Sequence, residues 1–280
     1  MKPPWLRIRP PGGKYAETRA ALANLHTVCQ SARCPNQAAC WGSGTATFLL
    51  LGDVCTRGCR FCATPKASAG LPLDEGEGAR IAEAARRMGL RYVVLTSVCR
   101  DDLPDGGAAH FAACIRALKE SGFLVEALIP DFGGEESRLR AVFDALPDVL
   151  AHNIETVERL TPHVRDRRAS YHQSLQVLAR AKRAGLITKS SLMLGLGERE
   201  EEVLRAMDDL RAVGCDILTI GQYLQPTPAH LPVAEFIHPD VFARYRDIAL
   251  AKGFRFVASG PFVRSSYRAG ELFAEMMKCR

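Results

Sequence analysis

Six short apolar stretches, joined by five segments with helical periodicity, constrain the fold of this chain most strongly. The predicted strands are 47–52, 91–97, 123–129, 149–153, 187–193 and 215–220, and the predicted helices between them are 76–88, 107–121, 135–145, 172–184 and 199–213. Strands that alternate with helices form parallel sheets through right-handed crossovers. Six such units are fewer than the eight of a closed barrel. We therefore predict an α/β fold, a partial (β/α)6 TIM-like barrel, with a doubly wound sheet as the alternative.

Two segments outside this alternation complete the chain. Residues 1–46 are rich in proline and glycine, contain one predicted helix at 14–25, and form an N-terminal extension. Residues 47–222 form the barrel, and residues 223–280 form a C-terminal extension. That extension begins with a proline-rich loop, followed by a helix at 240–252, a strand at 254–259 and a tail with a short helix. We expect the two extensions to cap the active site.

Six of the ten cysteines form two closely spaced triplets in the first quarter of the chain. The spacings are C-x4-C-x5-C and C-x3-C-x2-C, in Cys29, Cys34, Cys40 and Cys55, Cys59, Cys62. Three thiolates do not complete a tetrahedral zinc site, which needs a fourth ligand. On a [4Fe–4S] cluster they leave one iron open. The triplets therefore favour two [4Fe–4S] clusters with an open iron each, and zinc or a ferredoxin-type cluster is the alternative.

The second triplet follows the first predicted strand directly, at the end where active sites of barrel folds assemble. Gly58 permits the loop to turn between the cysteines. The spacing CxxxCxxC, with Phe61 before the last cysteine, resembles the signature of the radical S-adenosylmethionine superfamily. This resemblance implies that S-adenosylmethionine chelates the fourth iron and that the reduced cluster cleaves it to a 5′-deoxyadenosyl radical. It also implies that Phe61 packs near the adenine.

Both triplets together with a C-terminal serine motif resemble the lipoyl synthase family. The matching segments cover nearly the whole chain: HTVCQSARCPNQAAC (26–40), DVCTRGCRFC (53–62), RYVVLTSVCRDDLPDGGAAHF (91–111), AHNIET (151–156), TKSSLMLGLGE (188–198), LTIGQYLQP (218–226) and GPFVRSSYRAG (260–270). The resemblance implies an auxiliary [4Fe–4S] cluster on Cys29, Cys34 and Cys40, with the oxygen of Ser266 as its fourth ligand. In the family this cluster gives up its sulfide to the substrate.

The activity that the resemblance implies is radical insertion of two sulfur atoms, at C6 and C8 of an octanoyl chain carried on a lysine. The partners are an octanoylated lipoyl carrier domain, of a 2-oxoacid dehydrogenase E2 or a glycine cleavage H protein, and a flavodoxin or ferredoxin as electron donor. Two molecules of S-adenosylmethionine are consumed per lipoyl group. No catalytic residue is implied beyond the clusters.

Further contacts to S-adenosylmethionine are implied at two predicted strand ends. They are Gly195, Gly197 and Glu198 after the fifth strand, and Asn153 and Glu155 after the fourth. Taken without the resemblance, the first group is equally well an ordinary turn between strand and helix, and the second an ordinary capped strand end.

The remaining composition indicates a cytoplasmic protein. Lys and Arg exceed Asp and Glu by 37 − 31 = 6, without a concentrated basic run that would indicate nucleic-acid binding. The N-terminus lacks an apolar signal region, no apolar run is long enough to span a bilayer, and the clustered cysteines favour metal ligation in a reducing compartment. Of the cysteines outside the triplets, we expect Cys114 and Cys215 in the core and Cys99 in the active-site loop without a metal; Cys279 matches neither triplet.

Two other functions compete with this interpretation. Another radical sulfur-inserting enzyme, such as one resembling biotin synthase, shares the CxxxCxxC loop but not the first triplet with the serine tail. A two-cluster electron-transfer protein needs no large barrel, and its clusters are usually held by four thiolates.

Overall fold

The computed structural model describes residues 3–8, 10–267 and 269–278, so Cys279 lies outside the described residues. The chain divides into two compact units. The N-terminal unit consists of Ile8–Gly58 and Ala63–Val149, and the C-terminal unit consists of Met1–Arg7, Cys59–Cys62 and Leu150–Arg280. The boundary therefore passes through the loop of the second cysteine triplet.

Within the described residues, seven strands follow one another in chain order, from β1 at one end to β7 at the other. Their bounds are β1 Thr47–Leu50, β2 Tyr92–Ser97, β3 Leu124–Leu128, β4 Val149–Ala151, β5 Thr188–Leu194, β6 Ile217–Gln222 and β7 Phe256–Gly260. The pairs β1–β2, β2–β3, β4–β5, β5–β6 and β6–β7 are all parallel. The predicted α/β fold with a parallel sheet is confirmed. All six predicted barrel strands are present, and the predicted strand at 254–259 adds β7 beside β6.

The helices also follow the sequence pattern closely. Their bounds are α1 Tyr15–Ala21, α2 Val28–Ser31, α3 Gln37–Gly42, α4 Glu77–Arg87, α5 Ala108–Glu120, α6 Glu136–Phe143, α7 Thr161–Val164, α8 Tyr171–Arg183, α9 Glu200–Ala212, α10 Pro239–Ala251 and α11 Ala269–Lys278, with single 3-10 turns at Phe132–Gly134 and Glu158–Leu160. Among the described residues, no helix is both long enough and apolar enough to cross a bilayer.

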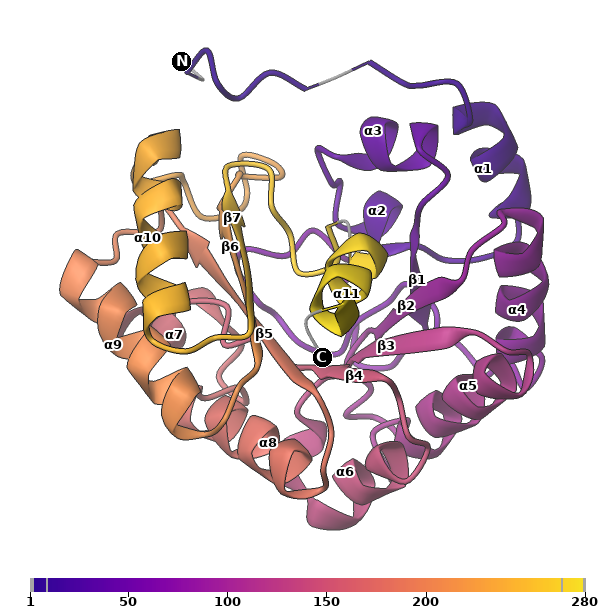
Figure 1. Cartoon of the computed structure of the whole chain (residues 1–280). Helices are drawn as coiled ribbons and strands as arrows, with labels where there is room; N and C mark the ends of the chain where they lie inside the picture. The colour runs from indigo at the N-terminus through magenta and orange to yellow at the C-terminus, as the bar shows by residue number, and fades with distance from the viewer. Residues whose placement is uncertain (1–2, 9, 268, 279–280) are drawn as a thin grey trace. The chain divides into compact units, whose positions relative to one another are not determined.

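In the N-terminal unit, α4, α5 and α6 lie along the outer side of β1, β2 and β3 (Figure 1). The strands carry almost continuous apolar runs because a parallel sheet is covered on both faces. Phe111, Ile115 and Leu118 of α5 are fully buried. Gly78 allows α4 to pass close to α5, since a β-carbon at this position would lie 3.1 Å from Cα of Cys114.

The N-terminal extension packs against the start of this sheet. Thr27 caps α2 with its side chain and forms an isolated antiparallel bridge to Phe48 of β1. The hydroxyl of the buried Thr18 in α1 donates to the carbonyl oxygen of Trp41 in α3 at 2.9 Å. The extension therefore has its own hydrogen-bonded structure, and the short helices α2 and α3 were not predicted from the sequence.

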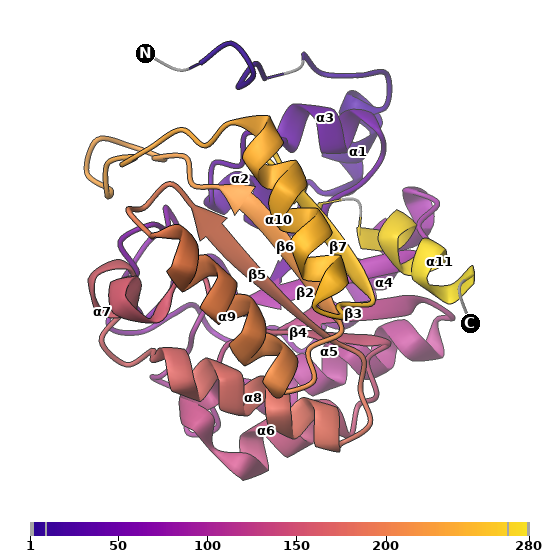
Figure 2. The ribbon, with the colours of Figure 1, turned by 60° about the vertical axis from the view of Figure 1, so that its left-hand side comes forward.

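In the C-terminal unit, α9 and α10 lie across one face of β5, β6 and β7 (Figure 2). Leu192, Leu218, Ile220 and Met207 form part of the shared core. The chain that follows β7 passes closely over β6. A β-carbon on Gly221 of β6 would lie 2.0 Å from the carbonyl oxygen of Val263, so only glycine fits there without displacing the tail.

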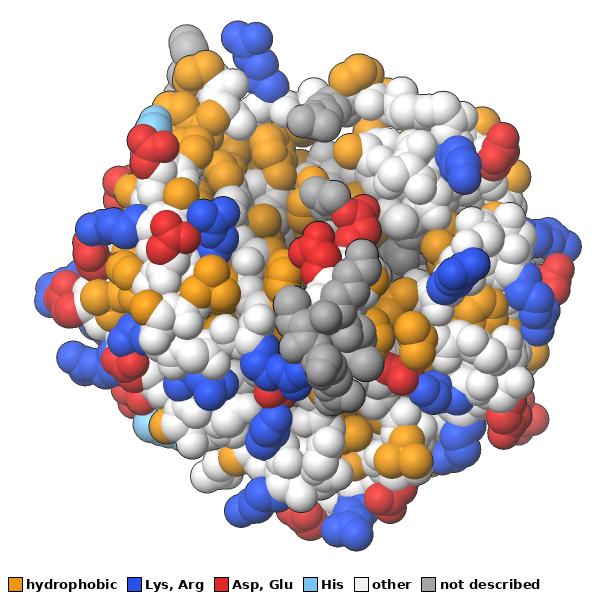
Figure 3. Space-filling model, viewed as in Figure 1, with side chains coloured by type: hydrophobic (Ala, Val, Ile, Leu, Met, Phe, Trp, Pro, Cys, Tyr) orange, Lys and Arg blue, Asp and Glu red, His pale blue; other side chains and the backbone are white. Residues whose placement is uncertain are grey.

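The surface carries both signs of charge. Basic and acidic side chains are interspersed around the face shown in Figure 3. Many are paired locally, as Arg86 is with Glu83 on α4 and Arg244 of α10 with Glu200 of α9. Within the part of the chain that the structure describes, the face shown in Figure 3 carries no single large basic patch.

Candidate active site

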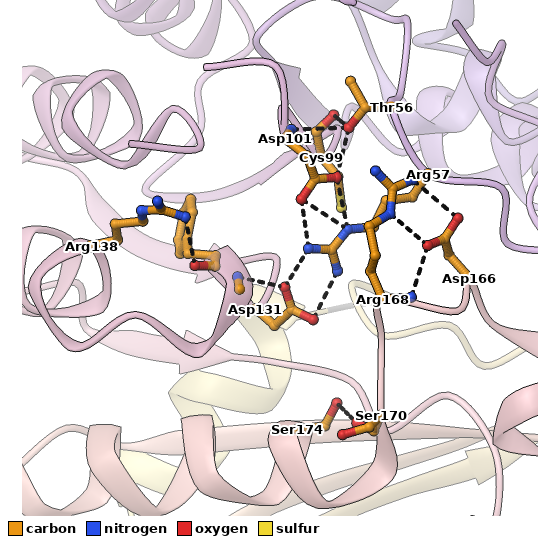
Figure 4. A network of polar contacts seen from close by, with 12 residues as sticks. Thr56, Arg57, Cys99, Asp101, Asp131, Arg138, Asp166, Arg168, Ser170 and Ser174 are labelled. Carbon is orange, nitrogen blue, oxygen red and sulfur yellow. Dashed lines mark hydrogen bonds and ion pairs between the residues drawn. The ribbon is translucent and has the colours of Figure 1, made fainter. Parts of the chain in front are cut away.

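A buried arginine joins three consecutive loops at the carboxyl ends of β1, β2 and β3. Arg57, in the loop after β1, donates from Nη2 to Oδ1 of Asp101 at 2.8 Å, and from Nη1 to Oδ2 of Asp131 at 2.8 Å (Figure 4). Asp101 follows β2, and Asp131 follows β3. The Arg57 side chain is 5% exposed and that of Asp131 is 1% exposed. The guanidinium therefore fixes the loop that carries Cys55.

This pairing keeps the arginine charged. Burial alone would lower the pKa of Arg57, but its hydrogen bonds to Asp101 and Asp131 outweigh burial and raise this pKa above its ordinary value. Ion pairs with several hydrogen bonds are stronger than single contacts. Asp131 is itself held by the N–H of Gly133, which donates to Oδ1 at 3.0 Å.

The sulfur of Cys55 accepts several hydrogen bonds. The backbone N–H groups of Arg57 and Cys99 donate to it, each at 3.4 Å. The Cys99 thiol also donates to it, and this contact is the largest cause that lowers the pKa of Cys55 to about 6. The same hydrogen bond raises the pKa of Cys99. Cys55 is thus prepared as a thiolate, the form that binds iron.

Arg100 also connects the loop after β2 to the end of β1. Its Nε donates to Oδ1 of Asp102 at 2.9 Å, and its Nη1 donates to the carbonyl oxygen of Leu51 at 3.4 Å. Glycine at position 70 leaves room for this side chain, because a β-carbon there would lie 2.5 Å from Nε of Arg100. Asp101 and Asp102 therefore pair with arginines of the loop region.

Cys59 and Cys62 belong to the C-terminal unit, where two other segments hold them. The N–H of Asp166 donates to the Cys59 sulfur at 3.3 Å. The N–H of Arg60 donates to the carbonyl of Val164 at 2.9 Å, and Nε2 of His230 donates to the carbonyl of Cys62 at 3.0 Å. Burial raises the pKa of Cys59 to about 11.

Asn153 and Glu155, the residues after β4 that were predicted to contact S-adenosylmethionine, belong to the same unit as Cys59. Asn153 donates from Nδ2 to Oε1 of Glu155 at 3.1 Å, and Oδ1 of Asn153 is buried without a hydrogen-bond partner among the described residues. Glu155 adopts φ +67°. Burial raises the pKa of Glu155. Its carboxylate also raises the pKa of Cys59, which indicates that the two groups are close.

The glycine turn after β5 is closed by its own acidic residue. The Glu198 carboxylate accepts the N–H of Gly195 at 2.5 Å and the N–H of Leu196 at 2.9 Å. Gly195 and Gly197 both have positive φ, of +95° and +101°. A β-carbon on Gly195 would lie 2.2 Å from Nε2 of Gln222. Glu198 therefore shapes the turn, and its contact with S-adenosylmethionine stays a prediction.

Phe61 is half-buried and packs against the same core cluster as Leu196 of this turn. Phe61, Cys59, the end of β4 and the glycine turn after β5 all belong to the C-terminal unit. The adenine contact predicted for Phe61 stays a prediction, and its packing on the core near Leu196 is compatible with it.

The three cysteines of the first triplet lie together in the N-terminal unit. The N–H of Cys34 donates to the carbonyl of Cys29 at 3.0 Å. Burial, and then the nearby thiols of Cys29 and Cys34, raise the pKa of Cys40 to about 12. Burial raises the pKa of Cys29 as well, and the backbone N–H of Thr47 and then the Trp41 indole partly oppose this. Nε1 of Trp41 is buried near the Cys29 sulfur but has no well-aligned hydrogen bond to any described residue.

Ser265 and Ser266 lie in a half-buried turn of the C-terminal unit that precedes α11. The turn is closed by the N–H of Tyr267, which donates to the carbonyl of Arg264 at 3.0 Å. Nη1 of Arg264 donates to the carbonyls of Val263 at 2.6 Å and of Pro261 at 3.4 Å, so the arginine stabilises the local conformation of the tail. The ligation of iron by Ser266 stays a prediction.

None of the described cysteines forms a disulfide. Cys114 and Cys215 are buried in the core, which confirms their prediction. Sequence reasoning missed Arg57 and Asp131, as well as the hydrogen bond from Cys99 to Cys55. The only signal available was the position of these residues directly after predicted strands.

The profile of the Radical SAM superfamily matches residues 49–210. Curated lipoyl synthases match over nearly the full length. That of Anaeromyxobacter dehalogenans is 59% identical over 97% of this chain and 95% of its own, and that of Thermus thermophilus is 58% identical over 98% and 87%. That of Pyrobaculum aerophilum is 52% identical over 99% and 98%. The chain belongs to the lipoyl synthase family.

Solved structures of other enzymes share the fold of this chain. Methylornithine synthase has a TM-score of 0.54 at 14% identity, over 87% of this chain and 81% of its own. Coproporphyrinogen III oxidase from Escherichia coli, described as a radical SAM enzyme, has a TM-score of 0.53 at 14% identity, over 73% and 52%. Membership of the superfamily implies a [4Fe–4S] cluster and S-adenosylmethionine, and makes this chain a radical SAM enzyme.

The residues present fit these groups. Backbone N–H groups already point at the sulfurs of Cys55 and Cys59. Such hydrogen bonds tune iron–sulfur clusters. The unpartnered Oδ1 of Asn153 offers a polar contact to a cofactor near Cys59. The buried indole N–H of Trp41 lies beside Cys29, where it is suited to an anionic sulfur.

We expect replacement of Arg57 by Met to destabilise the protein by about 3–5 kcal/mol, because Asp131 would lose the cation that faces its buried carboxylate. Replacement of Arg86 by Met is the matched control. Its pair with Glu83 is exposed, so the loss should be below about 1 kcal/mol. Denaturant unfolding measures both values, and equal losses would contradict a special role of Arg57.

We expect Cys55 in the cluster-free protein to react with iodoacetamide with a midpoint near pH 6. Thiolate is the reactive form, so the rate should rise with pH through the lowered pKa of about 6 and then level off. Replacement of Cys99 by Ala should move the midpoint upward, because the principal hydrogen bond is removed. Mass spectrometry of the labelled peptide measures the rate, and an unchanged midpoint in the variant would contradict this cause.

Proposed function

We propose that this chain inserts two sulfur atoms at C6 and C8 of an octanoyl group attached to a lysine of a lipoyl carrier domain. The observation that carries the proposal is the pair of cysteine triplets, none of whose members forms a disulfide, in a chain 52–59% identical to curated lipoyl synthases. Unactivated C–H bonds have no acidic proton, so acid–base catalysis does not reach them. Radical chemistry does.

The two triplets have different roles in the proposal. Cys55, Cys59 and Cys62 would hold the cluster that acts with S-adenosylmethionine, and Cys29, Cys34 and Cys40 with Ser266 would hold an auxiliary [4Fe–4S] cluster. When bound, the first cluster and S-adenosylmethionine supply the radical, and the second supplies sulfur. Two molecules of S-adenosylmethionine would be used for each lipoyl group, one for each C–H position.

In this proposal the side chains and backbone of the protein hold the cysteine loop and the cofactor in position. Arg57, held by Asp101 and Asp131, keeps the loop with Cys55 in place, and Asp166 directs its N–H at the Cys59 sulfur. Asn153 and Glu155 would bind the polar part of S-adenosylmethionine near Cys59. Gly195 and Gly197, in the turn that Glu198 closes, would let the backbone approach the cofactor, with Phe61 near its adenine.

The proposal extends to partners and organisation. The substrate would be an octanoylated carrier domain of the 2-oxoacid dehydrogenase E2 or glycine cleavage H protein type, and a flavodoxin or ferredoxin would supply electrons in the cytoplasm. Residues 1–46 and 223–280 would act as extensions of a barrel at 47–222 and would cap the active site.

Two cysteine variants test the division of roles. We expect Cys34→Ala to retain cleavage of S-adenosylmethionine but to form no lipoyl product, because only the sulfur donor is lost. We expect Cys59→Ala to lose cleavage itself. Chromatography of 5′-deoxyadenosine and mass spectrometry of an octanoyl-lysine peptide measure the two activities in the reconstituted, reduced enzyme.

The matched control is Cys215→Ala, which removes a buried thiol outside both triplets and should retain both activities. If Cys34→Ala and Cys59→Ala behave alike, the assignment of one triplet to radical formation and the other to sulfur donation is wrong.

A further inference from the structure

Three potential metal ligands meet between α4 and α5, outside both cysteine triplets. Glu77 is the first residue of α4, and His110 and Cys114 lie one turn apart on α5. Their ligand atoms all lie within 4.8 Å of one another. Oε2 of Glu77 is 2.7 Å from Nε2 of His110, and the Cys114 sulfur is 3.7 Å from the same nitrogen. We refer to these residues as the Glu77 cluster.

We propose that the Glu77 cluster is a binding site for one zinc ion. Zinc takes carboxylate oxygen and imidazole nitrogen at about 2.0–2.2 Å and thiolate sulfur at about 2.3 Å in tetrahedral geometry. Such bond lengths separate neighbouring ligand atoms by about 3.3–3.7 Å, so small adjustments would bring these three to one ion. A mixed set of oxygen, nitrogen and sulfur favours zinc over magnesium or calcium, which prefer oxygen alone.

Nε2 of His110 is within hydrogen-bonding distance of both the Glu77 carboxylate and the Cys114 sulfur, but one imidazole nitrogen has either one hydrogen or one lone pair and does not satisfy both neighbours. The Cys114 side chain is buried against the carboxylate, and a β-carbon on Gly78 would lie 3.5 Å from its sulfur. Burial, and then the charges of Glu77 and Asp74, raise the pKa of Cys114 to about 12. A cation at the centre would offset these effects, because it favours both the carboxylate and the thiolate.

A backbone contact orients the proposed carboxylate ligand. The N–H of Leu51, directly after β1, donates to Oε2 of Glu77 at 3.2 Å. Leu51 has a positive φ of +68° and lies four residues before Cys55. A zinc ion would therefore link α4, α5 and the end of β1, and would stabilise the base of the loop that carries Cys55.

The geometry leaves one position for a water molecule. Three protein ligands do not complete a tetrahedral site. The His110 side chain is 10% exposed and that of Glu77 is 8% exposed, so the site is nearly closed. We assign it a stabilising role that is separate from the proposed sulfur insertion.

Zinc binding is tested on the reconstituted holoprotein, in which iron occupies the cysteine triplets. We expect one zinc ion per chain by elemental analysis after titration with zinc and gel filtration, in the wild type and in the control variant Cys215→Ala. Binding to Cys114→Ala and His110→Ala should be at least about tenfold weaker, since loss of even a supporting residue typically costs 10–100-fold in metal affinity. Equal binding by all four proteins, or none by the wild type, would overturn the proposal.

Zinc K-edge absorption spectroscopy of the wild-type protein identifies the zinc ligands directly and does not require any variant to fold. We expect one sulfur at about 2.3 Å and nitrogen or oxygen scatterers at about 2.0–2.2 Å. Three sulfurs would place the zinc in a cysteine triplet, and no sulfur would exclude Cys114; either result overturns the assignment. Iron content and 5′-deoxyadenosine formation, measured in parallel, report on the triplets and so separate failure of this proposal from failure of the proposed function.

Discussion

The buried guanidinium of Arg57 is the interaction on which the candidate site in the N-terminal unit depends. It binds Asp101 after β2 and Asp131 after β3, and it is itself part of the loop after β1. Parallel strands bring their carboxyl ends to one edge, but loops at that edge need a specific contact to hold a fixed arrangement. A charge that is buried and multiply hydrogen-bonded supplies it, since separation of the partners would leave charges without compensation.

The two cysteine triplets are held in different ways, which is consistent with two different roles. The sulfurs of Cys55 and Cys59 accept backbone N–H groups from residues on barrel loops. In the first triplet, Cys29 lies on α2, Cys40 on α3 and Cys34 between these short helices. Burial raises the pKa of Cys29 and of Cys40, and the backbone N–H of Thr47 and then the Trp41 indole partly oppose this at Cys29.

The fold was largely predictable, because apolar runs of strand length and segments of helical periodicity are local properties of the sequence. Predicted strand and helix ends differ from those observed by a few residues at most. The contacts of Arg57 were not predictable, since nothing local shows that Asp101 and Asp131 point at one arginine. The helices that carry Cys29 and Cys40 were missed because short helices between glycines and prolines have weak periodicity. Cys99 was expected to lack a role as a ligand, and its hydrogen bond to Cys55 depends on the meeting of two loops.

The central claim is that each cysteine triplet holds an iron–sulfur cube with one iron not bound by a thiolate. Mössbauer spectroscopy of the anaerobically reconstituted protein, combined with iron and sulfide counting, tests this most directly. The account predicts two [4Fe–4S] clusters per chain, and a distinct change of one iron site when S-adenosylmethionine is added. A single cluster per chain, or two clusters whose spectra do not respond to S-adenosylmethionine, would contradict it.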